Sequence, residues 1–335
     1  MEPTKPIEFL AIGDMVTDAF IELLDAQVHC DINSENCTIS MRFGDKIPYK
    51  DVTVLNAVGN SPNASVATKR LGLTSAIMSH IGDDGVGKDC LAALDAEGIS
   101  KQYITVEAGK KTNYHYVLKY GPERTILIKH ESFDYKLPPL EQEPAWVYLS
   151  SIAEQALGFH DILADYLEAH PNVKLAFQPG TFQMKCGTER LARIYKRTDA
   201  FFCNKEEARR ILNLPNADFK ELHEGIRALG PKLVIITDGP KGLTASDEAG
   251  NGYFVPMYPD PKEPVERTGA GDATSSTIVA ALHLGLPLEK AILWGPINSM
   301  NVVQYVGAQA GLISRERLLE LLENAPMGYH SEKLF

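Results

Sequence analysis

Short apolar runs alternate with amphipathic segments along most of the chain, and this alternation restricts the possible folds more than any other feature. The runs that predict buried strands cover residues 8–13, 75–82, 145–151, 173–178, 200–204 and 233–237. The segments that predict helices cover residues 64–71, 87–97, 156–169, 206–212, 219–229, 272–284, 291–306 and 315–323. Strands that are apolar throughout are typical of a parallel sheet covered on both faces. The chain is therefore predicted to form an α/β fold with a doubly wound, mostly parallel sheet and helices on both faces.

Two regions interrupt this alternation. Residues 37–55 and 112–135 are rich in Tyr, Thr, Ile and Val with polar alternation, which indicates antiparallel hairpins. The second region holds two predicted strands, residues 114–120 and 124–130, joined by the turn Gly121-Pro122-Glu123. Because such strands do not suit a parallel core, we expect them to form a small sheet over one edge of it. No Gly/Ser-rich linker divides the chain, which predicts one domain over residues 1–335.

Composition excludes several classes of protein. Lys and Arg number 33 against 44 Asp and Glu, so the net charge is −11 and no basic stripe is present. A nucleic-acid partner is therefore not expected. No apolar stretch approaches the roughly 18 residues of a membrane helix, so no membrane partner is expected.

The cysteines point to a reducing compartment. Their positions are Cys30, Cys37, Cys90, Cys186 and Cys203, and they fit no zinc-ligand spacing. The start of the chain shows no secretion signal. We therefore expect a soluble, cytoplasmic protein with reduced cysteines.

The segment Thr268-Gly269-Ala270-Gly271-Asp272 stands directly before a predicted helix. A glycine-rich turn at a helix start directs several backbone N–H groups and the positive end of the helix dipole to one point, which suits a phosphoryl group. Asp272 is there either as a helix cap or as a functional group. A carboxylate beside an anion site is electrostatically unfavourable, and taking a proton from an attacking hydroxyl would give it a function.

A second cluster is Gly59, Asn60 and Asn63, at the start of another predicted helix. Two amides next to a flexible glycine are suited to binding the hydroxyl groups of a polar ligand. A turn followed by a helix cap explains the same residues. The sequence alone leaves both interpretations open.

Two more clusters follow predicted strands. Thr237, Gly239 and Gly242 form one of them, and Asn204 and Glu207 form the other. Ligands of open α/β sheets bind beyond the carboxyl ends of the strands, so both clusters lie at the expected edge. A capping role explains Asn204 and Glu207 as well as contact with a metal or a phosphate does.

One segment resembles a phosphate-binding loop without fulfilling its chemistry. The run from Gly82 to Lys88 has the glycine and lysine spacing of such a loop, but Asp89 replaces the hydroxyl residue that would bind Mg²⁺. Asp83 and Asp84 would also repel a phosphate. A P-loop ATPase is therefore not expected.

Together and in this order, the clusters resemble the ribokinase-like (PfkB) family of carbohydrate and nucleoside kinases. The Thr268–Asp272 segment is similar to the C-terminal signature of that family. The stretch from Gly59 through Asn63 to Arg70-Leu71-Gly72 is similar to its N-terminal signature. The glycine–aspartate turn at residues 82–84 recurs in the family without binding phosphate.

This resemblance implies an ATP- and Mg²⁺-dependent kinase that phosphorylates a hydroxyl of a small sugar. Asp272 would be the general base, and the amides of Gly269, Ala270 and Gly271 would form an anion hole for the transferring phosphate. Segments of about residues 14–55 and 103–135 would form a β-sheet lid inserted in the catalytic domain. The exposed edge of the lid would allow a homodimer.

The resemblance also implies which residues bind each ligand. The acceptor would be bound by Asp18, Gly59, Asn60, Asn63 and Asp272. The nucleotide would be bound by Asn204, Thr237, Gly239, Gly242 and Asn298. Glu207 would hold Mg²⁺ through water. Glu266-Arg267 replaces an Asp-Thr pair that is common before the C-terminal signature, which makes a K⁺ site doubtful.

Two alternatives differ in substrate or activity. Phe43, Tyr114, Tyr116 and Tyr120 lie in the lid segments, where they would either stack on a nucleobase or form the core of the small sheet. Stacking would indicate a nucleoside kinase. The same fold without catalysis would be a sugar or nucleoside sensor, but the presence of Asp272 and the glycine turn favours a kinase.

Overall fold

A ten-stranded sheet forms the centre of the molecule. The computed structural model describes residues 6–30, 37–121 and 123–335. The strands of the sheet are β1 (Phe9–Ile12), β6 (Ser75–Gly82), β7 (Ser100–Glu107), β10 (Trp146–Leu149), β11 (Lys174–Phe177), β12 (Ala200–Asn204), β13 (Leu233–Thr237), β14 (Leu243–Ser246), β15 (Gly252–Val255) and β16 (Glu332–Lys333). Their order is β16-β15-β14-β13-β12-β11-β10-β1-β6-β7. Neighbours from β7 to β13 pair in parallel, and the strands beyond β13 are antiparallel.

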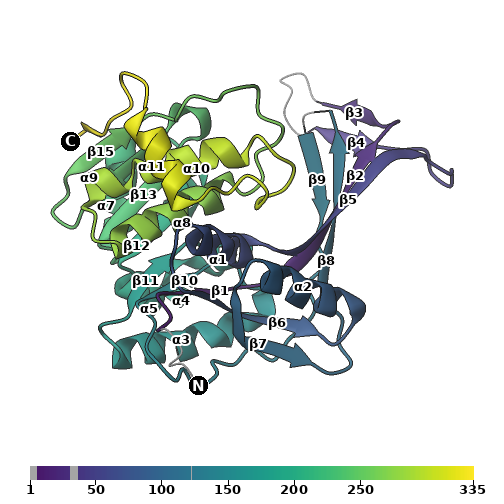
Figure 1. Cartoon of the computed structure of the whole chain (residues 1–335), viewed down its shortest axis with the longest axis horizontal. Coiled ribbons are helices and arrows are strands. Elements are labelled where there is room, and N and C mark those ends of the chain that lie inside the picture. The colour runs from purple at the N-terminus through teal and green to yellow at the C-terminus, as the bar shows by residue number, and fades with distance from the viewer. Residues whose placement is uncertain (1–5, 31–36, 122) are drawn as a thin grey trace.

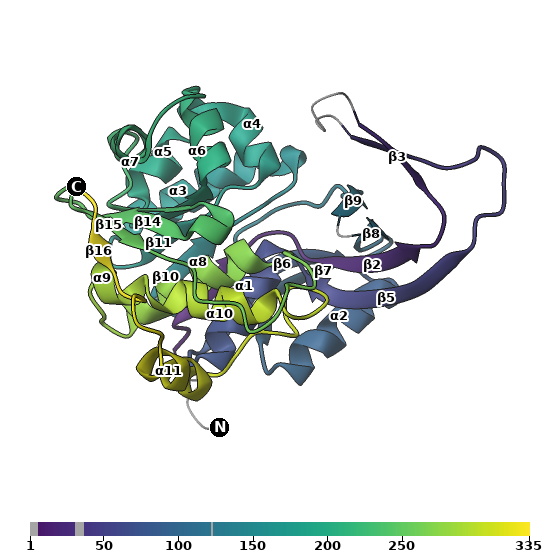
Figure 2. The same ribbon diagram turned by 90° about the horizontal axis from the view of Figure 1, so that it is seen from above.

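Helices cover both faces of this sheet (Figures 1 and 2). One face packs against α1 (Asn60–Arg70), α8 (Ala270–His283), α9 (Leu288–Ala291), α10 (Trp294–Val302) and α11 (Arg315–Glu323). The other packs against α3 (Leu157–Ala169), α5 (Ala192–Arg197), α6 (Lys205–Leu212) and α7 (Phe219–Ala228). The remaining helices are α2 (Gly85–Ala96), α4 (Thr181–Arg190) and the short 3₁₀ turns Glu154–Ala156 and Gly239–Lys241.

The alternation of side chains along each strand creates this layering. In β1, Leu10 and Ile12 join the core under α3, while Phe9 and Ala11 join the core under α8. Successive residues of a strand point to opposite faces, so a strand that is apolar throughout needs helices on both sides. The predicted fold class is confirmed.

Several helix boundaries differ from the prediction. Helix α1 begins at Asn60 instead of residue 64, because Pro62 fits the first turn of a helix. The helix predicted over residues 291–306 is present as the shorter α10, Trp294–Val302, and α9, Leu288–Ala291, precedes it. Helices α4 and α5 were not predicted, and Gly187 within α4 has a non-helical backbone with φ of 81°.

A second, smaller sheet projects from one side of the molecule (Figures 1 and 2). It consists of β2 (Val16–Leu23), β5 (Tyr49–Val58), β8 (Asn113–Tyr120) and β9 (Glu123–Leu127) in the order β5-β2-β8-β9. Strand β2 is antiparallel to β5 and parallel to β8. The predicted pairing of residues 114–120 with the strand after the turn is present as β8 and β9, although β9 ends at Leu127. Pro122 of that turn lies outside the described residues.

The hairpin predicted over residues 37–55 is wrong. Strand β4 (Thr38–Ser40) pairs with β3 (Gln27–His29), and β5 pairs with β2. Both partners lie earlier in the chain. Polar alternation identifies a strand, but its partner is set by which apolar faces meet in three dimensions.

A disulfide joins Cys30 to Cys37 beyond the β3–β4 pair. This overturns the expectation that all cysteines are reduced, while Cys90, Cys186 and Cys203 are free. The ends of paired strands bring two side chains together that sequence spacing alone does not. Among the described residues, no helix has the length and apolarity that a membrane crossing requires.

Candidate active site

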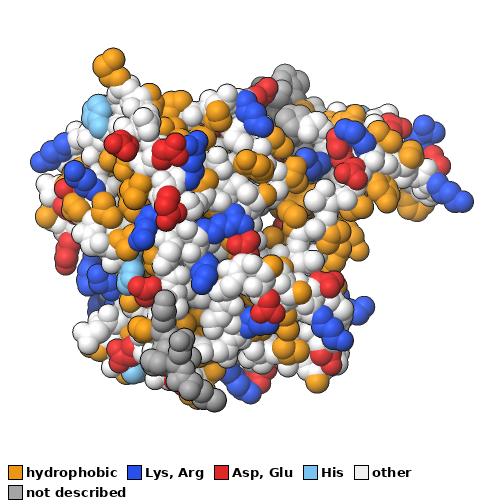
Figure 3. Space-filling model, viewed as in Figure 1, with side chains coloured by type: hydrophobic (Ala, Val, Ile, Leu, Met, Phe, Trp, Pro, Cys, Tyr) orange, Lys and Arg blue, Asp and Glu red, His pale blue; other side chains and the backbone are white. Residues whose placement is uncertain are grey.

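A cavity of about 550 Å³ lies between the carboxyl ends of the central strands and the small sheet. The surface is indented there, between the projecting arm and the body (Figure 3). Val16, Asp18 and Phe20 of β2 line it from the small sheet. Gly269 and Asp272 line it from the start of α8.

The start of α8 requires glycine. Gly269 has φ of 78°, and a Cβ at this position would lie 2.3 Å from the Cβ of Ala308. No side chain caps the helix, and the N–H groups of its first turn have no acceptor within it. The positive end of the helix dipole, at Gly269, Ala270 and Gly271, therefore faces the cavity.

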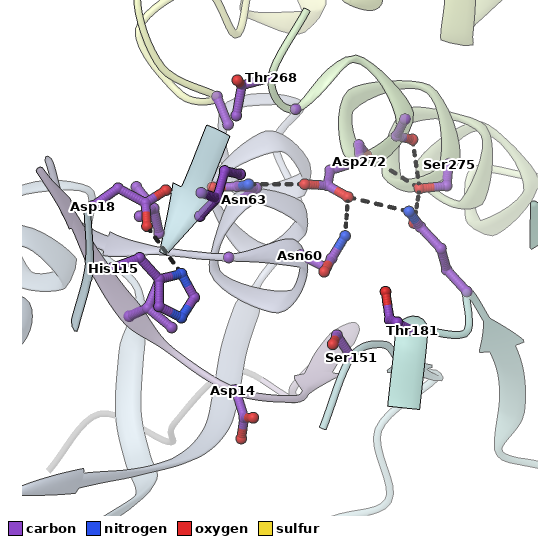
Figure 4. Close-up of a pocket in the computed structure, with 18 of the residues that line it drawn as sticks. Asp14, Asp18, Asn60, Asn63, His115, Ser151, Thr181, Thr268, Asp272 and Ser275 are labelled. Atoms are coloured by element: carbon purple, nitrogen blue, oxygen red, sulfur yellow. Dashed lines mark hydrogen bonds and ion pairs between the residues drawn. The ribbon is translucent and has the colours of Figure 1, made fainter. Parts of the chain in front are cut away.

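Asp272 is buried and accepts hydrogen bonds from amide side chains (Figure 4). Asn60 Nδ2 donates to Oδ1 at 2.7 Å, and Asn63 Nδ2 donates to Oδ2 at 2.8 Å. Gln178 Nε2 donates to Oδ1 at 3.1 Å. Burial raises the pKa of Asp272, and the three donors oppose that shift. A carboxylate has about four lone-pair directions, so these donors leave one on Oδ2 for a further hydroxyl.

Two of the three amides are themselves held in place. The side-chain oxygen of Gln178 accepts hydrogen bonds from the hydroxyls of Tyr148 and Ser275. The side-chain oxygen of Asn63 accepts a hydrogen bond from Gln309 Nε2 at 3.0 Å. Sequence reasoning missed both glutamines, because each lies far along the chain from Asp272 and belongs to no signature.

Two carboxylate–histidine pairs line the cavity below the small sheet. Asp18 Oδ1 lies 3.3 Å from His115 Nδ1, and Asp14 Oδ2 lies 3.0 Å from His130 Nδ1. Neither pair has the alignment of a hydrogen bond, so within the described part of the chain both oxygens lack a hydrogen-bond donor. Tyr135 donates a hydrogen bond to the other oxygen of Asp14. Only Asp18 was predicted; the other residues carry no signature spacing.

The predicted aromatic residues do not line this cavity. Tyr114 and Tyr116 flank His115 in β8, and their rings pack against each other with centroids 5.1 Å apart. Neighbouring residues of a strand point to opposite faces, so both tyrosines point away from the cavity. Tyr120 is also absent from the lining, and Phe43 is fully exposed.

A second cavity of about 350 Å³ adjoins the first. It is lined by Thr237, Gly239 and Gly242, as predicted for the nucleotide, and by Ala270 and Gly271. Gly242 has φ of 101°, and a Cβ there would lie 2.2 Å from the backbone oxygen of Val255. Thr237, Gly271 and Thr274 line both cavities. The two cavities therefore meet at the glycine turn.

Asn204 and Glu207 line the first cavity and also cap α6. Asn204 Oδ1 accepts from the backbone N–H of Glu207, and Glu207 Oε2 accepts from that of Asn204, both at 2.8 Å. Burial raises the pKa of Glu207. No cluster of three or more His, Cys, Asp or Glu side chains suited to a metal is found in the portion of the chain that the structure describes.

Asn298 is not part of either cavity, which corrects its prediction as a nucleotide ligand. It is fully buried in α10, where its Nδ2 donates to Thr277 Oγ1 at 2.8 Å and its Oδ1 accepts from Ile313 N. The sequence predicted correctly that Asn298 lies in a helix, but the direction of its side chain is set by how that helix packs. Its amide joins elements of the core.

The segment that resembled a phosphate-binding loop has a structural role. Asp84 caps α2 by accepting from Gly87 N at 2.9 Å and also accepts from Thr112 Oγ1. None of its residues lines the two cavities described above. The expectation that this segment does not bind phosphate agrees with that placement.

Comparisons with known proteins agree with this arrangement. A family model described as pfkB family carbohydrate kinase matches residues 21–315. The ribokinase of Bacillus subtilis (strain 168) is 28% identical over 295 residues, which are 83% of this chain and 94% of the relative. The nucleoside kinase of Methanocaldococcus jannaschii is 28% identical over 269 residues, 79% of this chain and 85% of the relative. The structure of Arabidopsis thaliana ribokinase with ribose and ATP superposes with a TM-score of 0.79 at 19% identity, covering 95% and 99% of the two chains.

Proposed function

The chain belongs to the pfkB family of carbohydrate kinases, and on that premise we propose that it transfers the γ-phosphoryl group of ATP to a hydroxyl of a small sugar. The observation that carries the proposal is the meeting of two cavities at the glycine turn, with the buried Asp272 beside it. One cavity then holds the sugar and the other the nucleotide. Transfer takes place where they meet.

The acceptor cavity suits a sugar better than a nucleobase. On the cavity side the small sheet presents Asp18 and His115, whereas Tyr114 and Tyr116 point away from it. Carboxylate oxygens without a hydrogen-bond donor bind hydroxyl groups well. The nucleoside alternative has one feature in its favour, which is that Phe182 and Phe20 also line the cavity.

In the proposed reaction Asp272 accepts the proton of the attacking hydroxyl as the new O–P bond forms, while the bond from the γ-phosphorus to the β,γ-bridging oxygen breaks and ADP leaves. The amides of Gly269, Ala270 and Gly271 hold the transferring phosphoryl oxygens, which gain negative charge in the transition state. Asp18, Gly59, Asn60 and Asn63 hold the acceptor in line with the phosphorus atom. Thr237, Gly239 and Gly242 hold the nucleotide.

The residues present fit a Mg²⁺ ion that arrives with the nucleotide. Glu207 is the carboxylate on the cavity wall nearest the start of α6, and Mg²⁺ commonly takes one or two carboxylates together with substrate phosphates. Glu207 would hold the ion through water, and bound Mg²⁺ neutralises phosphate charge. Glu266, at the doubtful K⁺ position, is buried and accepts from Gly307 N at 2.5 Å. The expectation against a K⁺ site stays a prediction.

The deciding experiment is a coupled assay of ADP release with Mg²⁺ and ATP. Separate reactions contain D-ribose, D-fructose, sugar acids, sugar phosphates or ribonucleosides, and Asp272→Asn is the control. We expect turnover of a sugar and a loss of about 10²–10⁴-fold in Asp272→Asn, because a general base is removed. Turnover of ribonucleosides alone would replace the sugar by the nucleoside alternative.

Two other outcomes contradict the mechanism. Near-wild-type turnover in Asp272→Asn would show that another group accepts the proton. Sugar binding in a thermal-shift assay without any turnover would favour the sensor.

A further inference from the structure

We propose that Gln178 is a positioning residue that fixes the carboxylate of Asp272 for proton transfer. The inference rests on the proposed role of Asp272 as base, and no signature of the chain includes Gln178. It lies directly after β11, which ends at Phe177, and its side chain reaches α8.

Two hydroxyl groups contact the Gln178 amide on the side away from Asp272. Tyr148 of β10 donates a hydrogen bond to its Oε1, and Ser275 Oγ donates to the same atom at 2.7 Å. The two hydroxyls also lie 2.6 Å from each other. Because an ionised carboxylate can only accept hydrogen bonds, the amide turns Nε2 toward Asp272 and Oε1 toward the two hydroxyls.

Burial makes this arrangement rigid. Tyr148 is fully buried, and Ser275 is 2% exposed. Rotation of the amide in this dry environment is unfavourable, because it would place Oε1 against the acceptor-only Oδ1 of Asp272 and remove the donor at 3.1 Å. The Gln178 N–H donor to Asp272 Oδ1 is therefore in place before the sugar binds. The unoccupied lone-pair direction of the carboxylate stays on Oδ2.

Other titratable groups also lie near Asp272, and their influence on its pKa is distinct from that of the Gln178 amide. Glu207 of α6 is the other carboxylate near it, and the Tyr148 hydroxyl stays protonated because burial raises its pKa far above the ordinary value. Cys203 of β12 and Lys185 of α4 also line this cavity, together with the charged or titratable residues Asp14, Asp18, His115, Arg124 and His130. Within the described residues Gln178 makes no hydrogen bond to Glu207, Cys203 or Lys185, and Asp272 is the one carboxylate to which its amide donates.

The test measures the protonation of Asp272 in two independent ways. The first is the acidic limb of the pH profile of kcat/KM, with Mg-ATP and the sugar that wild type turns over fastest. The second needs no substrate: it is a difference infrared titration of the protonated carboxyl band, with Asp272→Asn as the blank. If wild type turns over no sugar, the proposed function fails, and the infrared titration still tests Gln178.

In Gln178→Leu we expect both midpoints to move up by about one pH unit, because a lost N–H donor to a carboxylate is worth roughly that much. We expect kcat to fall about ten- to a hundredfold through misorientation, with the KM for ATP unchanged. Gln178→Glu has nearly the same shape but adds a carboxyl group. We expect it to move the midpoints at least as far, and it keeps the test available if the leucine variant does not fold.

The matched control is Gln183→Leu. Gln183 lies five residues further on, is 2% exposed and donates to the backbone oxygen of Ser150 at 2.9 Å instead of to Asp272. We expect it to lower thermal stability and to leave both midpoints unchanged. Midpoints in Gln178→Leu and Gln178→Glu that coincide with wild type would overturn the proposal and leave Gln178 a structural residue.

Discussion

Asp272 owes its surroundings to residues from three parts of the chain. Asn60 and Asn63 come from α1, Gln178 follows β11, and Asp272 itself begins α8. Asn63 and Gln178 have further hydrogen bonds that hold them, whereas the structure describes none for the side chain of Asn60 beyond that to Asp272. Asn60 is therefore the donor that rotates away at least cost.

The two ends of α8 allow a matched test of the glycine turn. Gly269 and Gly285 both have positive φ, 78° and 87°, but a Cβ at Gly269 collides with Ala308 while Gly285 faces open space. We expect Gly285→Ala to lose about 1–2 kcal/mol of stability through left-handed strain and to keep its activity. We expect Gly269→Ala to lose, in addition, about 100-fold in turnover, because the amides beside it shift.

The measurement for this pair is the initial rate of ADP release together with the thermal unfolding midpoint of each variant. Equal activity in the two alanine variants would contradict the role of the Gly269 turn.

At the scale of elements, the loop after α10 connects the end of α1 to the candidate active site. Arg70 near the end of α1 donates to the backbone oxygens of Gln309 at 2.9 Å and Leu312 at 2.8 Å and pairs with Glu97. Gln309 in turn donates to Asn63. The Arg70-Leu71-Gly72 part of the N-terminal signature therefore acts at a distance, by holding the loop whose Gln309 side chain donates to Asn63, which in turn donates to Asp272.

The contact between α7 and β14 makes stability depend on pH. His223 of α7 is fully buried, with Nδ1 2.9 Å from Ser246 Oγ and Nε2 2.9 Å from Thr244 Oγ1. Burial lowers the pKa of His223 to about 3. The unfolded chain binds a proton at this histidine below about pH 6.5 and the folded chain does not, so stability falls as pH drops from about 6.5 toward 3.

We expect wild type to lose about 2 kcal/mol of unfolding free energy through His223 between pH 6.5 and pH 5, since each pH unit is worth about 1.4 kcal/mol. His223→Gln lacks the titrating group and should show a smaller loss over the same interval. Urea unfolding at both pH values measures the difference. His330→Gln, which changes an exposed histidine, is the control and should behave as wild type. An equal pH dependence in wild type and His223→Gln would refute the assignment.

At the scale of the whole molecule, the projecting sheet has two different faces. Asp18 and His115 line the cavity on one face, while Ala19, Val54, Tyr116 and Leu127 lie opposite one another across the four strands on the other. Val54, Tyr116 and Leu127 are about half exposed, at 48%, 48% and 52%. An apolar row of this kind is usually covered by a partner.

The homodimer through the lid therefore stays a prediction, and this apolar row is the face through which we expect the two copies to meet. We expect a dimer in light scattering at micromolar concentration, because the second copy buries this row. Val54→Asp should give a monomer, while Leu319→Asp, which places the same charge on α11 at a similarly exposed position of 44%, should leave the dimer intact. A wild-type monomer would contradict the prediction.

The sequence by itself determined the α/β class, most of the central strands and the signature residues that line the two cavities. These depend on local patterns, because strand and helix periodicity and glycine turns are set by neighbours along the chain. Strand β6, strand β12 and helix α11 have the predicted bounds for that reason.

Only the tertiary structure decided the rest. The packing of distant elements decided which strands pair, β2 with β5 and β8, and brought Cys30 and Cys37 together in a disulfide. It also buried Asn298 and turned Tyr114 and Tyr116 away from the cavity. The contacts of Gln178 and Gln309 depend on such packing too. Gln178 contacts Asp272 across 94 residues of sequence, and Gln309 contacts Asn63 across 246 residues. Long-range packing leaves no local pattern from which such contacts can be predicted.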